Sequence, residues 1–389
     1  MKLLRAAALA MSATLMLAAC GSADGDSSSG NDSIKIGAWF PLSGAQASSG
    51  NPQMVGASTF WKKVNADGGI NGEKVDFVYK DNAFDPQQTL QIAREMVTRD
   101  KVDVIANANG TATTEATFPL VLEQNKTPIF GTYGGLTSWY DPPKDLLFGT
   151  QTLYENQAKI AAEWALEEGA RKITIVHDDP AAFVTVKDTA AKTIQAEGGS
   201  ADNVEVKIGT TDYGPALAAV KKQDPDAVLL ILPPQEAAAY LNEAALQRVD
   251  VQAYGYAPAV IEATVELAGA NAEGFRGVAL TKPTTADDPA VQEYRDDLAK
   301  YGDGAEPDLY SLATYGYAKA LSIILGSIDG KVDKASIAKA IESAQDVETG
   351  IVPPLSYSSD DHLGTDAGVR VEVENGEFVA KSDFISPKQ

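Results

Sequence analysis

The feature that most constrains the fold is a regular alternation of short β-branched runs with amphipathic helical patterns, which begins at Ser33. Residues 34–40 predict a first strand, and residues 54–65 predict a helix with Ala57, Phe60, Trp61 and Val64 on one face. Further strands are predicted at 75–79, 102–106 and 128–131, and further helices at 86–98 and 113–124. Strands that alternate with helices of this length form parallel sheets covered by helices on both faces.

A second series of the same kind runs from residue 155 to residue 277. Its strands are predicted at 172–177, 204–208, 227–232 and 252–256, with helices around Trp164, Thr189, Val220, Tyr240 and Val265. Two series predict two α/β domains. The tail no longer alternates, since it combines helices at 310–328 and 334–343 with a hairpin of 368–374 and 377–384 around Asn375-Gly376. Such a tail fits a chain that returns to domains already built.

The N-terminus has the pattern of an export signal. Lys2 and Arg5 precede an uncharged run at 6–19, which is shorter than the roughly 20 apolar residues of a membrane-spanning helix. Residues 17–20 (Leu-Ala-Ala-Cys) resemble the bacterial lipobox, and Cys20 is the only cysteine in the chain. We therefore expect residues 1–19 to be a lipoprotein signal peptide and Cys20 to be lipidated. The alternative is a plain secretory signal with an incidental cysteine.

Residues 20–33 are expected to form a lipidated, flexible tether, because they are almost all Gly, Ser, Asp, Asn and Ala. The remaining chain is long enough for two domains with substantial cores. Its formal charge, −22 for all 389 residues, becomes more negative once Lys2 and Arg5 are removed. An acidic surface of this kind is repelled by nucleic acid and by anionic lipid, so membrane contact is expected through the lipid alone.

Three short motifs carry a family resemblance. They are Ala-Asp-Gly-Gly-Ile-Asn-Gly-Glu-Lys at 66–74, Asp-Asn-Ala-Phe-Asp-Pro-Gln-Gln at 81–88 and Val-His-Asp-Asp at 176–179. In this order and spacing, behind a lipobox, the chain resembles the branched-chain amino-acid-binding proteins, which are periplasmic binding proteins of type I. The resemblance covers residues 34–384.

The resemblance implies an α/β fold of two Rossmann-like lobes joined by a three-segment hinge. Lobe one would comprise 33–150 plus 279–357, and lobe two 151–278 plus 358–389. It also implies a monomer that closes around a small-molecule ligand and delivers it to the permease and ATPase subunits of an ABC importer. The protein would be held at the extracytoplasmic face of the membrane, without a cofactor.

Candidate ligand-binding residues follow the strands, because ligands of open parallel sheets sit at the carboxyl ends of the strands. The loop 107–114 offers hydroxyls and backbone N–H groups at a predicted helix start, which suit a carboxylate or another polar head. The resemblance places Thr111 on the family's carboxylate-binding Ser/Thr, whereas the alternative role for this loop is simple helix capping. The same loop contributes Asn109 and Ala112.

Aromatic residues supply the rest of the expected site. Tyr133 and Gly134 lie in the next loop, Phe183 aligns with the aromatic residue that covers the ligand in the family, and Tyr154 lies in the linker to lobe two. The alternatives are a buried structural role for Tyr133 and interlobe packing for Phe183 and Tyr154. The full expected set is Ser49, Asn109, Thr111, Ala112, Tyr133, Gly134, Tyr154, Phe183, Tyr256, Ala257 and Tyr310.

Ala257 is the most informative departure from the family. Amino-acid-binding members carry an acidic residue here that holds the α-ammonium of the ligand, and a buried ammonium without a countercharge is costly. We therefore expect a ligand other than a simple branched-chain amino acid: an amino-acid-like molecule, an amide or an aromatic acid. Glu236 or Asp178 could replace the missing carboxylate, although both are expected to be solvated at helix starts.

The sequence predicts a binding protein and not an enzyme. It has no HExxH, no G-x-S-x-G and no phosphate-binding G-x-x-x-x-G-K-[ST], and no metal site is expected. Its two histidines, His177 and His362, are expected in structural or solvent-exposed roles. Two other functions remain open: a ligand-sensing lipoprotein of the same fold that serves a signalling receptor, and an anchored hydrolase that uses one of the histidines.

Overall fold

The computed structural model describes residues 33–388, so the expected signal peptide, Cys20 and most of the tether lie outside the described residues. Its first main sheet consists of parallel strands in the order β2-β1-β3-β4-β5. The strands are β1 (Ile34–Phe40), β2 (Val75–Asp81), β3 (Val104–Asn109), β4 (Ile129–Tyr133) and β5 (Leu147–Phe148). The carboxyl ends of β3 and β4 therefore meet at one edge of this sheet.

The second main sheet has the order β14-β13-β10-β9-β8-β6-β7. Strands β6 to β10 run parallel, and the C-terminal hairpin adds to β10 in the antiparallel direction. The strands are β6 (Lys172–Asp178), β7 (Ser200–Val206), β8 (Ala227–Ile231), β9 (Gln252–Gly255), β10 (Arg276–Ala279), β13 (Gly368–Glu374) and β14 (Glu377–Ile385). A small hairpin is formed by β11 (Ser356–Ser358) and β12 (Asp361–Gly364).

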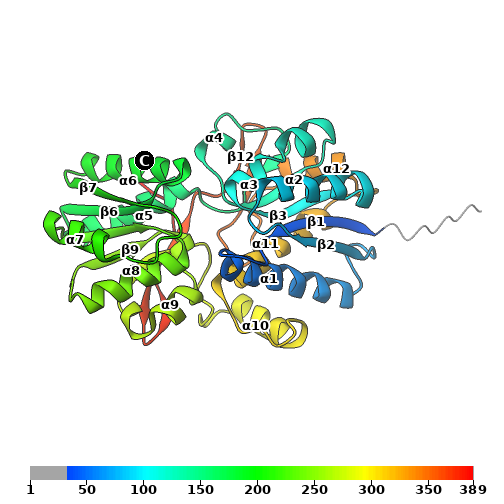
Figure 1. Ribbon diagram of the computed structural model, residues 1–389. Coiled ribbons are helices and arrows are strands. Elements are labelled where there is room, and N and C mark those ends of the chain that lie inside the picture. Colours follow the sequence, from blue (N-terminus) through cyan, green and yellow to red (C-terminus); the bar gives the residue numbers. More distant parts are fainter. Residues whose placement is uncertain (1–32, 389) are drawn as a thin grey trace, which may run out of the picture. The chain divides into compact units, whose positions relative to one another are not determined.

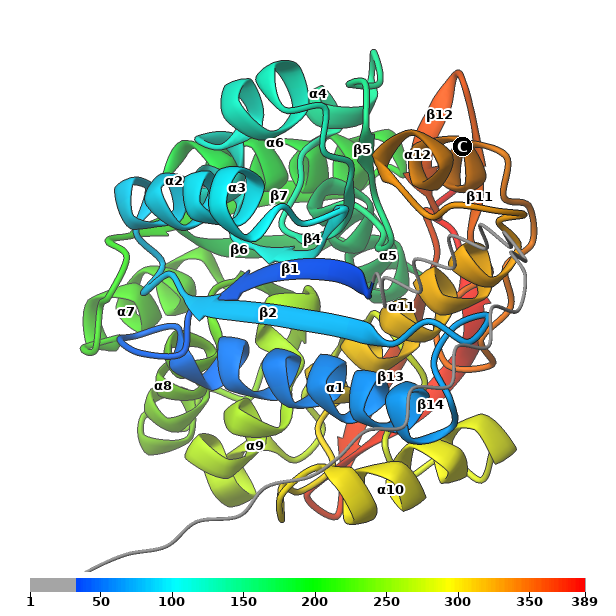
Figure 2. The ribbon, with the colours of Figure 1, turned by 90° about the vertical axis from the view of Figure 1, so that its right-hand side faces the viewer.

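Helices cover both faces of the first sheet. Figures 1 and 2 show α2 and α3 on one face of β1 and β2 and α1 on the other. We call this sheet and its helices lobe one. The helices are α1 (Ala47–Ala66), α2 (Pro86–Glu95), α3 (Thr111–Glu115), α4 (Thr137–Tyr140), α10 (Pro289–Tyr301), α11 (Leu309–Gly326) and α12 (Lys334–Glu342). The apolar face predicted for α1 is buried, and it packs in one cluster with β1 and α11.

Lobe two is the second sheet with the helices between its strands. These are α5 (Tyr154–Glu167), α6 (Ala181–Ala196), α7 (Gly214–Gln223), α8 (Pro234–Leu246) and α9 (Glu262–Ala268). The chain passes from lobe one to lobe two after β5, returns after β10 and passes again after β12. The two-lobed α/β fold is therefore confirmed. The exact lobe boundaries stay a prediction. The hydrogen bond from Gly149 N to His362 O joins β12 to the segment that follows β5 of lobe one, so it favours a third crossing after residue 364, where β12 ends.

Two predicted elements differ from the structure for clear reasons. The helix expected at 113–124 is divided into α3 and a π-helical turn at Pro119–Gln124, because a proline inside a helix removes a backbone hydrogen bond. The strand expected at 204–208 is β7, which begins at Ser200 and pairs with β6 along its whole length. The short strands β5 and β10 are not predicted, because their own residues show no clear strand pattern. They form by pairing with neighbouring strands, β5 with β4 and β10 with β9 and β13.

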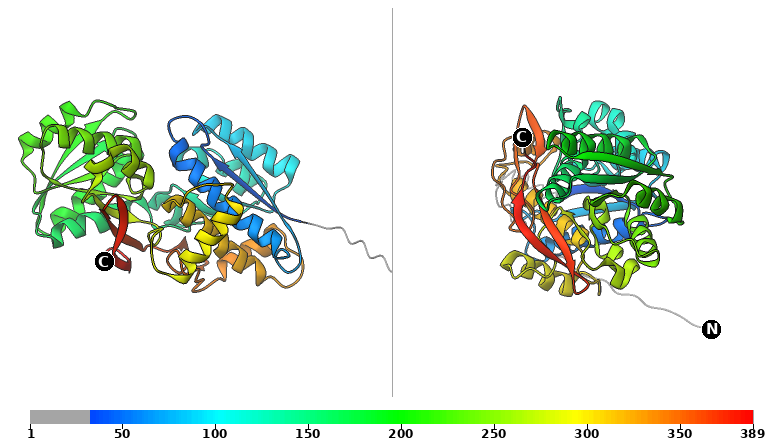
Figure 3. Two further views of the ribbon diagram at one scale, coloured as in Figure 1. Left: turned by 90° about the horizontal axis from the view of Figure 1, so that it is seen from below. Right: turned by 90° about the vertical axis from the view of Figure 1, so that its left-hand side faces the viewer.

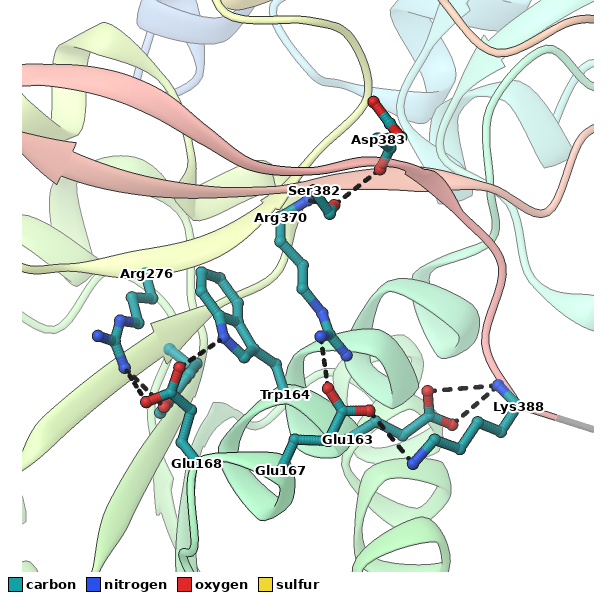
Figure 4. Close-up of polar contacts among 10 residues, drawn as sticks. Glu163, Trp164, Glu167, Glu168, Arg276, Arg370, Ser382, Asp383 and Lys388 are labelled. Carbon is teal, nitrogen blue, oxygen red and sulfur yellow. Dashed lines mark hydrogen bonds and ion pairs between the residues drawn. The ribbon is translucent and has the colours of Figure 1, made fainter.

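The C-terminal hairpin, whose bounds the sequence predicts closely, contacts α5 through side chains of β13 (Figures 3 and 4). The indole of Trp164 lies between two guanidinium groups, with ring centroid distances of 5.5 Å to Arg276 and 5.6 Å to Arg370. Glu167 pairs with Arg370, and Glu168 accepts a bond from the indole N–H at 3.2 Å. Cation–π contacts and ion pairs together hold the end of the chain on lobe two. No helix within residues 33–388 is long and apolar enough to cross a bilayer.

Candidate ligand-binding pocket

A pocket of about 200 Å³ lies at the carboxyl ends of strands from both sheets. Lobe one contributes Asn109 to Ala112 after β3 and Tyr133 at the end of β4, and Tyr310 enters from the first turn of α11. Lobe two contributes Phe183 from α6 and Tyr256 after β9. This is the position expected for a ligand in open parallel sheets.

Most of the expected ligand-binding residues come together in this pocket. Gly134 and Ala257 do not line it. Gly134 supports the neighbouring loop, because a Cβ atom there would lie 2.8 Å from the Thr111 backbone N, and Ala257 is buried with its N–H bonded to Gln157 Oε1 at 3.0 Å. The residues that line the pocket are Ser49, Asn109, Thr111, Ala112, Tyr133, Tyr154, Phe183, Tyr256 and Tyr310. Their contact with a ligand stays a prediction.

Four tyrosines form much of the wall. The rings of Tyr154 and Tyr256 meet edge to face at 5.5 Å, and those of Tyr133 and Tyr310 lie 5.4 Å apart. Burial raises the pKa of all four phenols above the ordinary value, so they remain protonated hydrogen-bond donors. Tyr133 also shares a hydrogen bond with Thr314, so it has a structural role besides lining the pocket.

The loop after β3 is held by its own side chains. Asn109 Nδ2 donates to Gln53 Oε1 at 2.6 Å, and Thr113 Oγ1 donates to Asn109 O at 2.6 Å. The N-cap of α3 is Gly110, which has a φ of +96° and no side chain to cap the helix. Helix capping by Thr111 is therefore not observed, and the residue lines the pocket. Because α3 has only five residues, the predicted contribution of a helix dipole is weak.

The described residues that line the pocket include no Asp, Glu, Lys, Arg or His. The wall is apolar apart from hydroxyl and amide groups, with Phe84, Phe183, Val186 and Ile208 beside the tyrosines. Several prolines complete it: Pro180, Pro233, Pro234 and Pro258. A ligand ammonium would find no countercharge on this wall, whereas an apolar body with a hydrogen-bonding head is well matched.

The expectation that Asp178 and Glu236 are solvated is wrong. Their exposed fractions are 0% and 7%. Glu236 accepts bonds from Gly209 N at 2.9 Å and from the Tyr213 hydroxyl at 2.8 Å, whereas Asp178 accepts none from a described N–H or hydroxyl. Burial, together with the charge of Glu236, raises the pKa of Asp178 to about 8. Neither residue lines the pocket, and Glu236 is covered by the loop that carries Gly209 and Tyr213.

The histidines also lie away from the pocket. His177 is buried, with Nδ1 2.8 Å from Asp178 O. His362 is buried as well, since Nδ1 lies 3.0 Å from Lys144 O and its ring packs 4.6 Å from that of Phe148. Both are therefore structural, and a solvent-exposed role for His362 is ruled out. Within residues 33–388, no group of three or more Asp, Glu, His or Cys side chains is arranged to hold a metal ion.

Comparison with known proteins identifies the class. The family described as "Periplasmic binding protein" matches residues 33–377, so this chain belongs to the periplasmic binding proteins. Among curated relatives, the Leu/Ile/Val-binding protein of Escherichia coli K12 is 26% identical over 345 residues, which cover 87% of this chain and 90% of that protein. The Leu/Ile/Val-binding protein homolog 1 of Brucella melitensis is 26% identical over 330 residues, 83% of this chain and 86% of that protein.

Solved structures agree on the fold. A possible leucine/isoleucine/valine-binding protein from Rhodopirellula baltica superposes with a TM-score of 0.83 at 19% identity, covering 90% of this chain and 96% of that chain. An ABC transporter solute-binding protein from R. palustris in complex with 4-hydroxybenzoate gives a TM-score of 0.79 at 24% identity, with 91% and 96% covered. The predicted family and its two-lobed architecture are confirmed.

Proposed function

We propose that this protein is the solute receptor of an ABC importer and that its ligand is a small carboxylic acid with an aromatic or similarly apolar body. The observation that carries the proposal is the pocket itself: residues of both lobes line it, its wall is uncharged, and hydroxyl-bearing residues, four tyrosines and Thr111 among them, line it. A ligand that touches both lobes stabilises their closed arrangement, which a membrane permease can then recognise.

The uncharged wall of the pocket supports a carboxylic acid over an amino acid as the ligand. An amino acid brings an ammonium group, for which the wall offers no carboxylate, and the family resemblance aligns Ala257 with the acidic residue of amino-acid-binding members. A carboxylate can instead take charge-assisted hydrogen bonds from the Thr111 hydroxyl and protonated phenols. The R. palustris relative, which was solved with 4-hydroxybenzoate, supports the same class.

A thermal-shift panel tests the receptor role and the ligand class together. Benzoate, 4-hydroxybenzoate and phenylacetate are compared with benzamide and with leucine, isoleucine and valine. A true ligand at 100 times its Kd adds roughly 2.7 kcal/mol to the free energy of unfolding. We expect the acids to raise the unfolding temperature and the amino acids to leave it unchanged. Stabilisation by leucine alone would overturn the ligand class, and a folded protein that responds to no compound would contradict the receptor role.

Anchoring through Cys20 is part of the same proposal. A lipidated cysteine followed by a polar tether would keep the receptor beside its permease. In cells that express the full chain, the wild-type protein should sediment with membranes, and the Cys20→Ala variant should appear in the soluble extracytoplasmic fraction. Equal membrane association of both would contradict lipidation at Cys20.

A further inference from the structure

A second contact between the lobes lies beside the pocket, where α9 of lobe two meets the first turn of α11 of lobe one. Glu262, the first residue of α9, accepts a hydrogen bond from Leu309 N through Oε2 at 2.8 Å. Asp308, the N-cap of α11, accepts from Tyr310 N at 2.7 Å and from Ser311 N at 3.1 Å through Oδ1. Two carboxyl groups from different lobes therefore converge on three successive N–H groups.

Apolar packing at this point also interlocks the lobes. Leu309 belongs to the buried cluster of lobe two, although it begins a helix of lobe one. Ile261, which directly precedes Glu262, belongs in turn to the buried cluster of lobe one. The next residue after Leu309 is Tyr310, which lines the pocket. The position of the Glu262 carboxyl thus bears on the position of a pocket wall.

The two carboxyl groups are surrounded by acids and neutral groups. They line a cavity of about 340 Å³ with Glu266 and Glu306, to which α1 contributes only uncharged residues. The Thr284 hydroxyl donates to Glu262 Oε1 at 3.4 Å, and from α10 the Tyr294 hydroxyl accepts a bond from Asp308 N at 3.3 Å.

The nearby cation does not neutralise the pair. Arg295, also on α10, directs its guanidinium to Thr284 O at 2.6 Å and to Ala286 O. No ion pair joins either carboxyl group to a cation among residues 33–388.

Ionisation of both carboxyl groups is energetically unfavourable, because they lie close to other acids and to neutral groups and pair with no cation. Burial and the charge of Asp308 raise the pKa of Glu262 well above its ordinary value. Burial also raises the pKa of Asp308, to about 6, despite the backbone N–H groups that favour its ionised form. The pair titrates as a unit, and it retains a proton to a higher pH than two separated, solvated carboxyl groups would.

We propose that Glu262 and Asp308 share a proton across the two lobes. Glu262 is thereby a positioning residue for Tyr310, and the contact of Glu262 with Leu309 N couples closure of the lobes to uptake of a proton. Both residues are half-buried while the lobes are joined, and separation of the lobes would remove Glu262 from Leu309 and expose both carboxyl groups fully to water, where each ionises. The proposal rests on the proposed function only in assuming that the lobes move relative to each other.

The sign of the effect follows from the raised pKa values. A carboxyl group whose pKa is higher in the joined state stabilises that state fully at pH values below its ordinary pKa, and this contribution is lost as the pH rises through the raised value. The arrangement of lobes seen here should therefore be favoured at pH 5 and weakened at pH 8.

The test uses the full chain without any added ligand. Thermal unfolding and small-angle X-ray scattering are recorded across this pH range for the wild type, for Glu262→Gln and for the control Glu205→Gln, whose side chain is exposed on β7 of lobe two. Glutamine keeps an oxygen acceptor for Leu309 N but carries no charge. We expect the unfolding temperature of the wild type and of the control to fall with rising pH by roughly 2 °C more than that of Glu262→Gln. Their radius of gyration should increase as well, while that of Glu262→Gln stays constant.

Two outcomes would overturn the proposal. One is a pH profile of Glu262→Gln that follows the wild type in both measurements. The other is stabilisation of the wild type by calcium chloride that EDTA reverses, because a metal ion and not a proton would then neutralise the pair. Asp308→Asn, which retains a good N-cap, provides a second variant and should show the same flattened profile. Since no ligand is present, failure here is distinct from failure of the thermal-shift panel.

Discussion

The side-chain amide of Gln235 reaches from the first turn of α8 in lobe two to Ser48 in α1 of lobe one, where Nε2 donates to Oγ at 2.5 Å. The same nitrogen lies 3.2 Å from Ala45 O. Both neighbours of this contact, Ser49 and Pro234, line the pocket. Gln235 thus links the lobes at the pocket through hydrogen bonds that exist only while the lobes are together.

Removal of this link should weaken ligand binding. Gln235→Ala loses a net hydrogen-bond contribution of about 1 kcal/mol in the joined arrangement only, so the Kd should rise roughly fivefold. The Kd of each variant is measured by isothermal titration calorimetry with the most stabilising compound of the thermal-shift panel. Asn242→Ala is the matched control, because Asn242 lies on the same helix and donates to Leu267 O within lobe two. An unchanged Kd in Gln235→Ala would show that the link is not coupled to binding.

Thr111 tests the carboxylate-binding role of the loop after β3. Thr111→Val preserves the shape of the side chain and removes the hydroxyl, and the loss of a hydrogen bond to a charged group should raise the Kd for an aromatic acid by about tenfold or more. The Kd for the corresponding neutral amide should change less. Thr185→Val is the control, since Thr185 is exposed on α6 and bonds only Ala181 O. Equal effects on acid and amide would place the carboxylate elsewhere.

Gly56 tests the close approach of α1 and α11. A Cβ atom at Gly56 would lie 2.0 Å from Ser311 O, so Gly56→Ala must move the helices apart. Overpacking of this kind costs about 1–3 kcal/mol, which urea unfolding would detect. Ligand affinity should fall as well, because Ser311 follows Tyr310. Gly326→Ala is the control, as a Cβ there has no neighbour within 4 Å. Equal stability of the two variants would refute the contact.

Asp178 should give lobe two a characteristic pH dependence. Its pKa is raised to about 8 in the folded chain, so its stabilising contribution is complete below the ordinary carboxyl pKa and is lost as the pH rises toward 8. Asp178→Asn should flatten this fall in unfolding free energy between pH 5 and 8. Asp202→Asn replaces an exposed carboxylate and should keep the wild-type slope. Parallel slopes in all three proteins would mean that Asp178 is ionised throughout.

Arg370 should matter more for stability than an ordinary surface arginine. It packs on the indole of Trp164 and pairs with Glu167, so Arg370→Ala should lower the unfolding free energy by about 1–2 kcal/mol and increase amide exchange in β13 and β14. Arg99→Ala removes an arginine from exposed pairs with Glu95 and Asp100 and should cost much less. A similar loss in both variants would argue against the stacked arrangement.

The sequence predicts well what depends on local pattern. The apolar face at Ala57, Phe60, Trp61 and Val64 is buried, and the hairpin around Asn375-Gly376 forms almost at its predicted bounds. Strand alternation also places the loops of the pocket correctly, since the carboxyl ends of parallel strands meet at one edge. Most of the expected site therefore comes together.

The errors arise where distant segments decide the outcome. Nothing local shows that the Tyr213 hydroxyl and Gly209 cover Glu236, so its burial, and that of Asp178, could not be predicted. Proline residues at the pocket are not predicted either, although Pro233 directly follows a predicted strand and Pro180 lies three residues after another, and these positions are a usable signal. Ala257 lies between two residues that line the pocket, Tyr256 and Pro258, yet its own side chain is buried and does not line the pocket.

The pairing of β13 with β10 has a consequence for biosynthesis. β10 can pair with β13 only after the C-terminal residues have been synthesised. The sheet of lobe one, in turn, is covered only after α11 has been synthesised. The sheet of lobe two is completed only after β13 and β14 have been synthesised, so its folding depends on contacts of long sequence separation. A chain whose second sheet is completed this late is suited to passage through an export channel before it folds, and export is what its N-terminal sequence predicts.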